Sequence, residues 1–187
     1  MLFIEIAGLI AFSISGALAA FKKDLDIVGY VVVGVVTGIG GGTLRDLILN
    51  RTVFWIGDPY LYSLNICIAT AVVTYFFGRF IENRKNIVNW FDALGLALFA
   101  IQGYAIAFQM HGNFEIALIM GVVTGVGGGL MRDICLNRQP FIFRGELYAS
   151  AVAAGLLVYY LSDSIALSFA TSFTLRAGAI KFGWRLK

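Results

Sequence analysis

GVVTGIGGGTLRDLILNR, residues 34–51, occurs a second time as GVVTGVGGGLMRDICLNR at residues 121–138. The offset between the copies is 87 residues without a gap, and 13 of the 18 positions are identical. Each copy contains three consecutive glycines followed by an Arg-Asp pair inside an apolar run. An internal repeat of this kind determines how the rest of the chain is interpreted. The sequence therefore predicts two copies of one structural unit.

The composition is that of a membrane protein. Of the 187 residues 59% are hydrophobic and 13% are charged, and the mean hydropathy is +0.84. A soluble domain carries about 25% charged residues. A membrane-spanning helix needs roughly 20 apolar residues, so seven such segments leave no room for a soluble domain. The expected spans are about 2–21, 27–49, 60–80, 90–109, 114–136, 147–161 and 165–182.

The 87-residue offset extends beyond the glycine stretch. It aligns Glu5 with Asp92 and Phe12 with Phe99, so the first three spans repeat as the next three. Because three is an odd number, the second copy enters the membrane from the opposite side. We predict an all-α polytopic membrane protein with seven transmembrane helices, two inverted three-helix repeats and a seventh helix. The expected single transmembrane domain, 1–187, contains repeats at about 2–80 and 89–162 and helix seven at about 165–183.

The basic residues predict the orientation. Two of the 14 Lys and Arg residues, Arg45 and Arg51, fall on the side of the N-terminus. Positive charge accumulates on cytoplasmic loops. We expect a multi-pass protein of the cell (inner or plasma) membrane with its N-terminus outside and its C-terminus cytoplasmic. The twelve residues expected on the cytoplasmic side are Lys22, Lys23, Arg79, Arg84, Lys85, Arg132, Arg138, Arg144, Arg176, Lys181, Arg185 and Lys187.

Three interpretations of the glycine stretch compete. A phosphate-binding loop is disfavoured, because no Lys-Ser or Lys-Thr follows the glycines and the G-x-G-x-x-G spacing fails at Thr43 and Leu130. A stripe of small residues every fourth position, such as Gly34-Gly38-Gly42, is typical of close helix packing. A break in the helix at membrane depth would instead expose carbonyl oxygens that suit a cation.

We favour the broken helix, because the packing stripe leaves several of the glycines unexplained, and keep packing as the alternative. The threonines one turn before the glycines could offer their hydroxyls to an ion or bond back to the helix. Ser13, Ser15 and Gln102 are further polar positions that could face the same cavity. The candidate ion pathway consists of Thr37, Gly40, Gly41, Gly42, Asp46, Thr124, Gly127, Gly128, Gly129 and Asp133.

Charges inside spans are costly and mark function or a buried partner. Neighbours on a helix point about 100° apart, so Arg45 and Asp46 are not expected to pair with each other. We predict symmetry-related structural ion pairs near the two pore mouths instead, Glu5–Arg45 and Asp92–Arg132. The acidic residues of the two motifs, Asp46 and Asp133, would then be free to favour cations. The alternative is that these side chains extend to the lipid headgroups.

Nothing in the sequence resembles a nucleophile–base pair or a cluster of metal ligands. We therefore predict that the protein is not an enzyme, that it needs no cofactor, and that it binds no metal beyond permeating monovalent cations. The net charge of +3 comes from basic residues at loops between spans, so it does not indicate binding of nucleic acid.

The doubled GGG-x-x-RD motif, the three-plus-three-plus-one spans and the ending LRAGAIKFGWRL at 175–186 resemble the prokaryotic branch of the trimeric intracellular cation (TRIC) channel family, also labelled glycine-transporter-domain membrane proteins. The resemblance implies a homotrimer in membrane lipids with one pore inside each protomer, lined by kinked spans two and five. It also implies permeation of potassium and sodium ions.

Two classes of function therefore remain. One is a channel for monovalent cations, permeable to potassium, whose pore is lined by glycine-broken helices two and five. The alternative is a secondary transporter of a small solute such as glycine, since inverted repeats and broken helices serve both classes. A scaffold without transport activity would not explain two glycine stretches.

Overall fold

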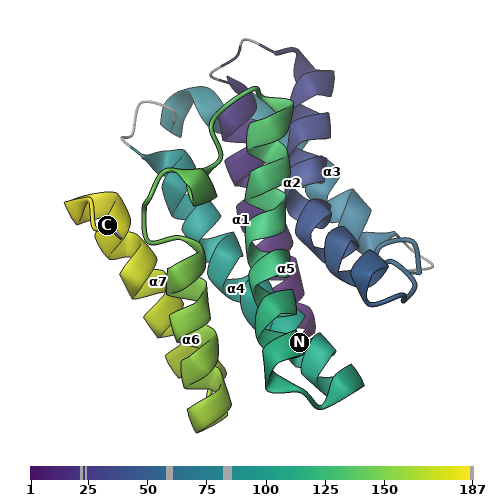
Figure 1. Cartoon of the computed structure of the whole chain (residues 1–187). Helices are drawn as coiled ribbons and strands as arrows, with labels where there is room; N and C mark the ends of the chain where they lie inside the picture. The colour runs from purple at the N-terminus through teal and green to yellow at the C-terminus, as the bar shows by residue number, and fades with distance from the viewer. Residues whose placement is uncertain (22, 24, 58–60, 82–85, 186–187) are drawn as a thin grey trace.

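The computed structural model describes residues 1–21, 23, 25–57, 61–81 and 86–185, which form a bundle of helices (Figure 1). The described residues form seven α-helices and one 3₁₀ turn, which are joined by loops. The helices begin and end within a few residues of the spans expected from the sequence. They are α1 (Leu2–Phe21), α2 (Ile27–Ile48), α3 (Tyr62–Ile81), α4 (Ile87–His111), α5 (Phe114–Cys135), η1 (Phe141–Phe143), α6 (Ala149–Ser162) and α7 (Ile165–Phe182).

Local sequence signals explain several helix ends. Asp26 and Asn113, which the 87-residue offset aligns, both cap a helix: each side chain accepts a hydrogen bond from the backbone three residues on, at 2.8 and 2.9 Å. Such caps satisfy amide groups that have no partner within the helix. The residues that follow α4 and α7, Gly112 and Gly183, are both in the left-handed conformation that favours glycine at the end of a helix.

The helices differ in how well they suit a membrane span. α1, α2, α4 and α5 are long and apolar enough to cross a bilayer by length and composition. α3 is apolar over a shorter stretch, and α6 has only 14 residues. Fourteen residues of α-helix rise about 21 Å, less than the roughly 30 Å hydrocarbon thickness.

The first helices of the two repeats, α1 and α4, pack together at the centre of the bundle. The rings of Phe12 and Phe99 stack with centroids 5.5 Å apart. A Cβ on Gly95 would lie 2.6 Å from the Phe12 ring, and one on Gly8 would lie 3.2 Å from Phe99. The start of α1 contacts the end of α4, and the end of α1 contacts the start of α4. These contacts show that the two helices run antiparallel, as an inverted repeat requires.

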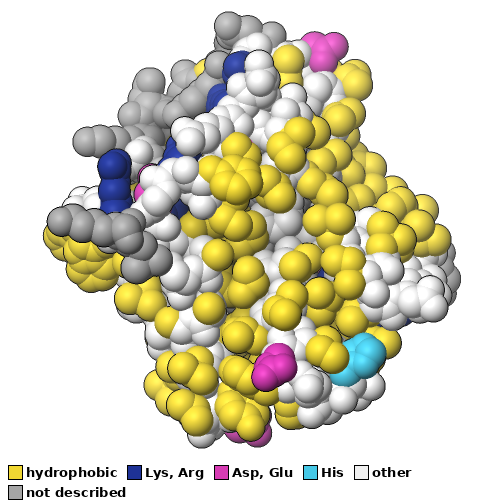
Figure 2. Space-filling view, viewed as in Figure 1, with side chains coloured by type: hydrophobic (Ala, Val, Ile, Leu, Met, Phe, Trp, Pro, Cys, Tyr) yellow, Lys and Arg dark blue, Asp and Glu magenta, His cyan; other side chains and the backbone are white. Residues whose placement is uncertain are grey.

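The remaining helices surround this centre. α2 crosses α5, α3 packs on α1 and α2, and α6 packs beside α7 at one flank of the bundle (Figure 1). Hydrophobic side chains cover most of the face seen in Figure 2, whereas Lys and Arg side chains gather mostly toward the end near the C-terminus. Such an apolar surface suits contact with lipid. Of the basic residues used to predict orientation, Lys22, Arg84, Lys85, Lys187 and the side chain of Arg79 lie outside what the structure describes.

Candidate functional site

The glycine stretches do not break their helices. α2 and α5 are continuous α-helix through Gly40–Gly42 and Gly127–Gly129, so the prediction of glycine-broken helices is wrong. The backbone hydrogen bonds of a helix survive because glycine lowers helix stability by only about 1 kcal/mol per residue. Close packing between the two helices offsets that cost.

The glycines allow the backbones of α2 and α5 to touch. A Cβ added to Gly41 would collide with the carbonyl oxygen of Thr124, and one added to Gly128 would collide with the carbonyl oxygen of Thr37. A Cβ on Gly127 would lie 3.0 Å from the Cα of Gly41. Helix packing therefore accounts for glycines that lie off the four-residue stripe.

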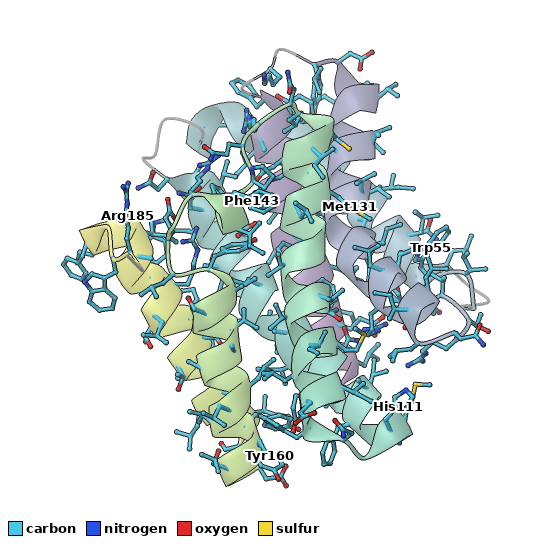
Figure 3. The ribbon with its side chains drawn as sticks, in the orientation of Figure 1. Trp55, His111, Met131, Phe143, Tyr160 and Arg185 are labelled. Carbon is cyan, nitrogen blue, oxygen red and sulfur yellow. The ribbon has the colours of Figure 1, made fainter. Side chains whose placement is uncertain are left out.

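The other glycines of the two stretches make room for large side chains. A Cβ on Gly40 would lie 2.5 Å from the Met131 sulfur, which Figure 3 places on α5. One on Gly42 would lie 2.6 Å from the Phe54 ring, and one on Gly129 would lie 2.6 Å from the Tyr148 hydroxyl. Every position of the two triglycines is thus in contact with a neighbouring element.

The two threonines before the glycines bond back to their own helices. Thr37 Oγ1 donates to the Val33 carbonyl and Thr124 Oγ1 donates to the Met120 carbonyl, both at 2.6 Å. Both residues are fully buried. Of the two roles considered from the sequence, the structure shows the bond to the helix.

A buried cluster surrounds Arg132 near the end of α5. Its Nη1 lies 2.7 Å from Asp92 Oδ1 on α4, so the predicted Asp92–Arg132 pair is present. The same nitrogen donates to Ser15 Oγ on α1 at 2.7 Å. Its Nε lies 2.9 Å from Asp133. The Arg132 side chain is fully buried, so it does not extend to headgroups, and Asp133 is neutralised rather than free.

The equivalent residues of the first repeat are arranged differently. Arg45 Nε lies 2.8 Å from Asp46 Oδ1, although neighbouring residues were not expected to pair. The long arginine stem lets the guanidinium turn back toward the adjacent carboxylate. Asp46 also pairs with Arg51 at 3.4 Å and accepts the Phe54 backbone N–H at 2.8 Å. Asp46 therefore anchors the chain after α2 and is not free to attract cations.

The predicted Glu5–Arg45 pair is wrong. Glu5 accepts hydrogen bonds from Gln102 Nε2 at 2.7 Å and from Ser63 Oγ at 3.2 Å. The ion pairs among the described residues do not include Glu5. Arg45 is 1% exposed and its Nη1 has no hydrogen-bond partner among the described groups. Ser15 and Gln102 thus stabilise charges at opposite ends of the bundle rather than facing one cavity.

Arg51 and Arg138, which follow α2 and α5, also differ in their partners. Arg138 donates from Nη2 to the carbonyl of Ala19 at 2.8 Å, which ties the end of α5 to the end of α1. Burial lowers the pKa of Arg138 below its ordinary value, and the nearby Asp133 carboxylate opposes that shift. Its counterpart Arg51 is instead more than one third exposed and pairs with Asp46.

Arg176 was expected only as one of the basic residues on the cytoplasmic side, but it is a buried charge. It lies on α7 and is fully buried, with its Nη1 2.7 Å from Glu146. Its guanidinium lies over the rings of Phe141 and Tyr148, at 5.4 and 4.9 Å from their centroids. A charge within the apolar run 165–182 was the signal, because such charges mark a buried partner.

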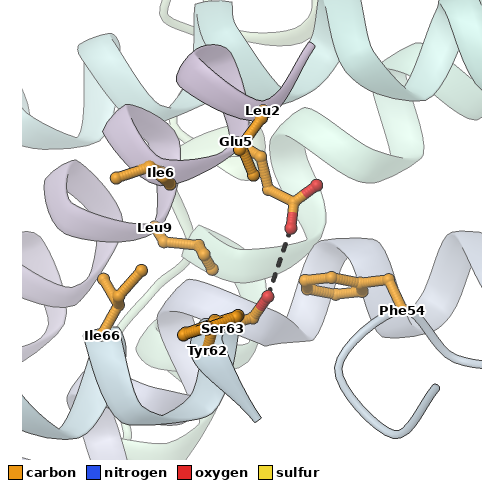
Figure 4. Close-up of a pocket in the computed structure, with 8 residues that line it drawn as sticks. All are labelled: Leu2, Glu5, Ile6, Leu9, Phe54, Tyr62, Ser63 and Ile66. Atoms are coloured by element: carbon orange, nitrogen blue, oxygen red, sulfur yellow. Dashed lines mark hydrogen bonds between the residues drawn. The ribbon is translucent and has the colours of Figure 1, made fainter. Parts of the chain in front are cut away.

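A cavity opens at the end of the bundle where α1 begins (Figure 4). Its volume is about 440 Å³, and the Glu5 carboxylate projects into it with its hydrogen bond from Ser63. The lining is otherwise mainly apolar. It consists of Leu2, Glu5, Ile6, Leu9, Phe54, Tyr62, Ser63 and Ile66.

Known proteins resemble this chain over nearly its whole length. The family model described as "Glycine transporter" matches residues 2–79 and 89–164. The inner membrane protein YadS of Escherichia coli K12 is 37% identical over 198 residues, which cover 98% of this chain and 92% of that protein. The membrane protein YvgT of Bacillus subtilis is 32% identical, with coverage of 98% and 93%.

Solved structures agree with the described fold. The TRIC trimeric intracellular cation channel orthologue from Rhodobacter sphaeroides has a TM-score of 0.89 and 38% identity, and the match covers 98% of both chains. A prokaryotic TRIC channel crystallised in 0.5 M KCl has a TM-score of 0.89 and 30% identity, covering 98% of this chain and 97% of that one. The chain therefore belongs to the prokaryotic TRIC channel family, whose sequence model is described as "Glycine transporter".

Proposed function

We propose that this protein is a channel for monovalent cations, chiefly potassium and also sodium, that assembles as a homotrimer with one pore in each protomer. The observation that carries the proposal is the TM-score of 0.89 and 38% identity to the TRIC cation channel orthologue over 98% of the chain. The fold places the two glycine stretches against each other at the α2–α5 crossing. The solved relatives are channels rather than enzymes or carriers.

The proposed pathway follows the crossing of α2 and α5. It includes the threonines and glycines expected from the sequence, with the glycines of both helices at its narrowest level. In the described conformation the two backbones are in contact there. Conduction would therefore require α2 and α5 to separate near the glycines, and no side chain of either triglycine would obstruct the opening. The neutralised Asp46 and Asp133 would position the ends of these helices rather than bind ions.

The proposed orientation puts the N-terminus outside and the C-terminus in the cytoplasm of the cell in which the protein resides. Arg132, Arg138, Arg144 and Arg176 lie toward the end of the bundle where α7 finishes, and Arg45 and Arg51 lie toward the other. This distribution supports the orientation, because basic residues gather on the cytoplasmic side. Membrane lipids would contact the apolar outer surface.

Ion flux from proteoliposomes tests the proposal against the transporter alternative. Vesicles loaded with KCl and diluted into choline chloride with a protonophore, which lets protons balance the charge, should release potassium down its gradient faster than protein-free vesicles. The same preparation should not accumulate labelled glycine under a potassium or proton gradient. Glycine accumulation without passive potassium release would contradict the proposal and favour a carrier, in keeping with the family description.

A further inference from the structure

The inverted repeat gives the Glu5 cavity a counterpart at the other end of the bundle. The 87-residue offset aligns Glu5 with Asp92, Phe54 with Phe141 and Ser63 with Ser150. Each end thus has a carboxylate on the first helix of a repeat and an aromatic ring in the chain after the second helix. The two ends differ in what lies against these groups.

At the Asp92 end the chain supplies its own cations. Arg132 pairs with Asp92 at 2.7 Å, and its Cζ lies 4.9 Å from the Phe141 centroid. Arg176 and Arg144 lie over the same ring at 5.4 and 4.4 Å. Arg176 comes from α7, which stands outside the repeat. This end is therefore built around guanidinium groups carried on apolar stems.

At the Glu5 end no basic side chain of the described residues pairs with the carboxylate. Gln102 and Ser63 donate hydrogen bonds to it, which keeps it oriented toward the cavity. Arg45 lies 5.6 Å from the Phe54 centroid but is paired with Asp46. The seventh helix has no equivalent here, because only three helices repeat.

We propose that the Glu5 cavity binds an organic cation with an apolar stem, such as an alkylammonium or alkylguanidinium ion. The carboxylate would pair with the cationic head, and Phe54 and Tyr62 would offer ring faces to it. The apolar stem would lie against Leu9, Ile6 and neighbouring carbon atoms. A volume of about 440 Å³ falls within the range of small-molecule sites.

An inorganic cation fits this lining less well. Potassium sites replace the hydration shell with several oxygen atoms. The polar side chains that line the cavity are Glu5, Ser63 and Tyr62, and the other lining residues are hydrophobic. The aromatic and aliphatic surface instead matches the body of an organic ion, as Arg176 does at the opposite end.

Binding of benzyltrimethylammonium to the full-length protein in nanodiscs tests this proposal without reference to ion flux. Calorimetric titration should give saturable binding that empty nanodiscs do not show. Glu5→Gln should weaken the affinity by at least about tenfold. Glu115→Gln, an exposed acid at the same end of the bundle, should leave it unchanged. Tyr62→Leu, on an exposed side chain, should weaken binding severalfold and serves as a second variant if Glu5→Gln does not fold.

Three results would overturn the proposal. These are no saturable binding by the folded wild-type protein, equal binding by wild type and both cavity variants, and full displacement of the probe by an equal concentration of KCl. The last result would indicate a site for inorganic cations. None of the three bears on whether the protein conducts potassium, so the channel proposal stands or falls separately.

Discussion

Arg45 and Arg132 occupy equivalent positions in the two repeats but have different partners. Arg132 is surrounded by Asp92, Asp133 and Ser15, whereas Arg45 forms an ion pair with Asp46 alone among the residues that the structure describes. A buried cation needs such partners because an uncompensated charge is expensive in a medium of low dielectric constant. The charge of Arg132 at the Asp92 end is therefore better compensated than the charge of Arg45.

Asp92→Asn should destabilise the protein more than Glu5→Gln does. The first change removes a carboxylate that pairs with a fully buried arginine. We expect a cost of about 2 kcal/mol, below the ~3–5 kcal/mol of a fully broken buried pair because Asp133 still compensates Arg132. In Glu5→Gln the amide oxygen can still accept from Gln102, and the Ser63 hydroxyl can turn to accept from the new amide NH2, so the effect should stay within about 0.5 kcal/mol. Thermal melting of both variants in the same detergent measures the difference, and equal losses would contradict this account.

The contacts of single residues were predictable from the sequence where the position in the repeat alone determines the partner. The Asp92–Arg132 pair follows from the repeat and from the cost of charge in a span. The Arg45–Asp46 pair was missed, because a rule about helix faces ignores how far an arginine stem can turn back. The role of Glu5 was missed for a related reason, since Gln102 and Ser63 come from helices whose relative depth no sequence pattern specifies.

At the scale of elements, the α2–α5 crossing depends on the absence of side chains. The Cα atoms and carbonyl groups of the two helices approach so closely that even a methyl group does not fit at Gly41 or Gly128. The repeat indicated that these glycines determine the structure of the two helices. Close helix packing, which the structure shows, was the alternative interpretation of the same residues. It could not distinguish a broken helix from a close crossing, because both need glycine and both occur in membranes.

Gly128→Ala should separate α2 from α5 and lower the melting temperature. Its Cβ would collide with the Thr37 carbonyl, and overpacking of this kind costs roughly 1–3 kcal/mol. Gly78→Ala on α3 is the matched control. Its Cβ would lie 3.6 Å from Leu18, so alanine should be neutral or stabilise by up to about 1 kcal/mol. A Gly128→Ala protein as stable as the Gly78→Ala protein would rule out the tight crossing.

α7 is attached through Arg176, and a double-mutant cycle can measure that attachment. Glu146→Gln leaves a fully buried guanidinium without its carboxylate, whereas Arg176→Met leaves a glutamate whose side chain is 21% exposed. We therefore expect Glu146→Gln to cost more stability than Arg176→Met. The coupling energy between the two sites should be about 0.5–3 kcal/mol. Additive losses in melting experiments would show that the pair does not hold α7 in place.

At the scale of the whole molecule, the repeat predicts most of the architecture. An offset of 87 residues and an odd number of spans per copy are enough to predict that α1 and α4 run antiparallel. The asymmetry between the ends was not predictable in the same way. It arises because α7 stands outside the repeat and places Arg176 against Phe141 at one end only.

The channel proposal is tested most directly by recording currents from the purified protein in a planar bilayer under a tenfold KCl gradient. Discrete current steps should appear, with a reversal potential close to that of potassium, about 59 mV in magnitude for a tenfold gradient. Replacing potassium by choline on both sides should abolish them. A reversal potential near the chloride value, or a silent bilayer containing protein shown to be folded and inserted, would contradict a cation channel.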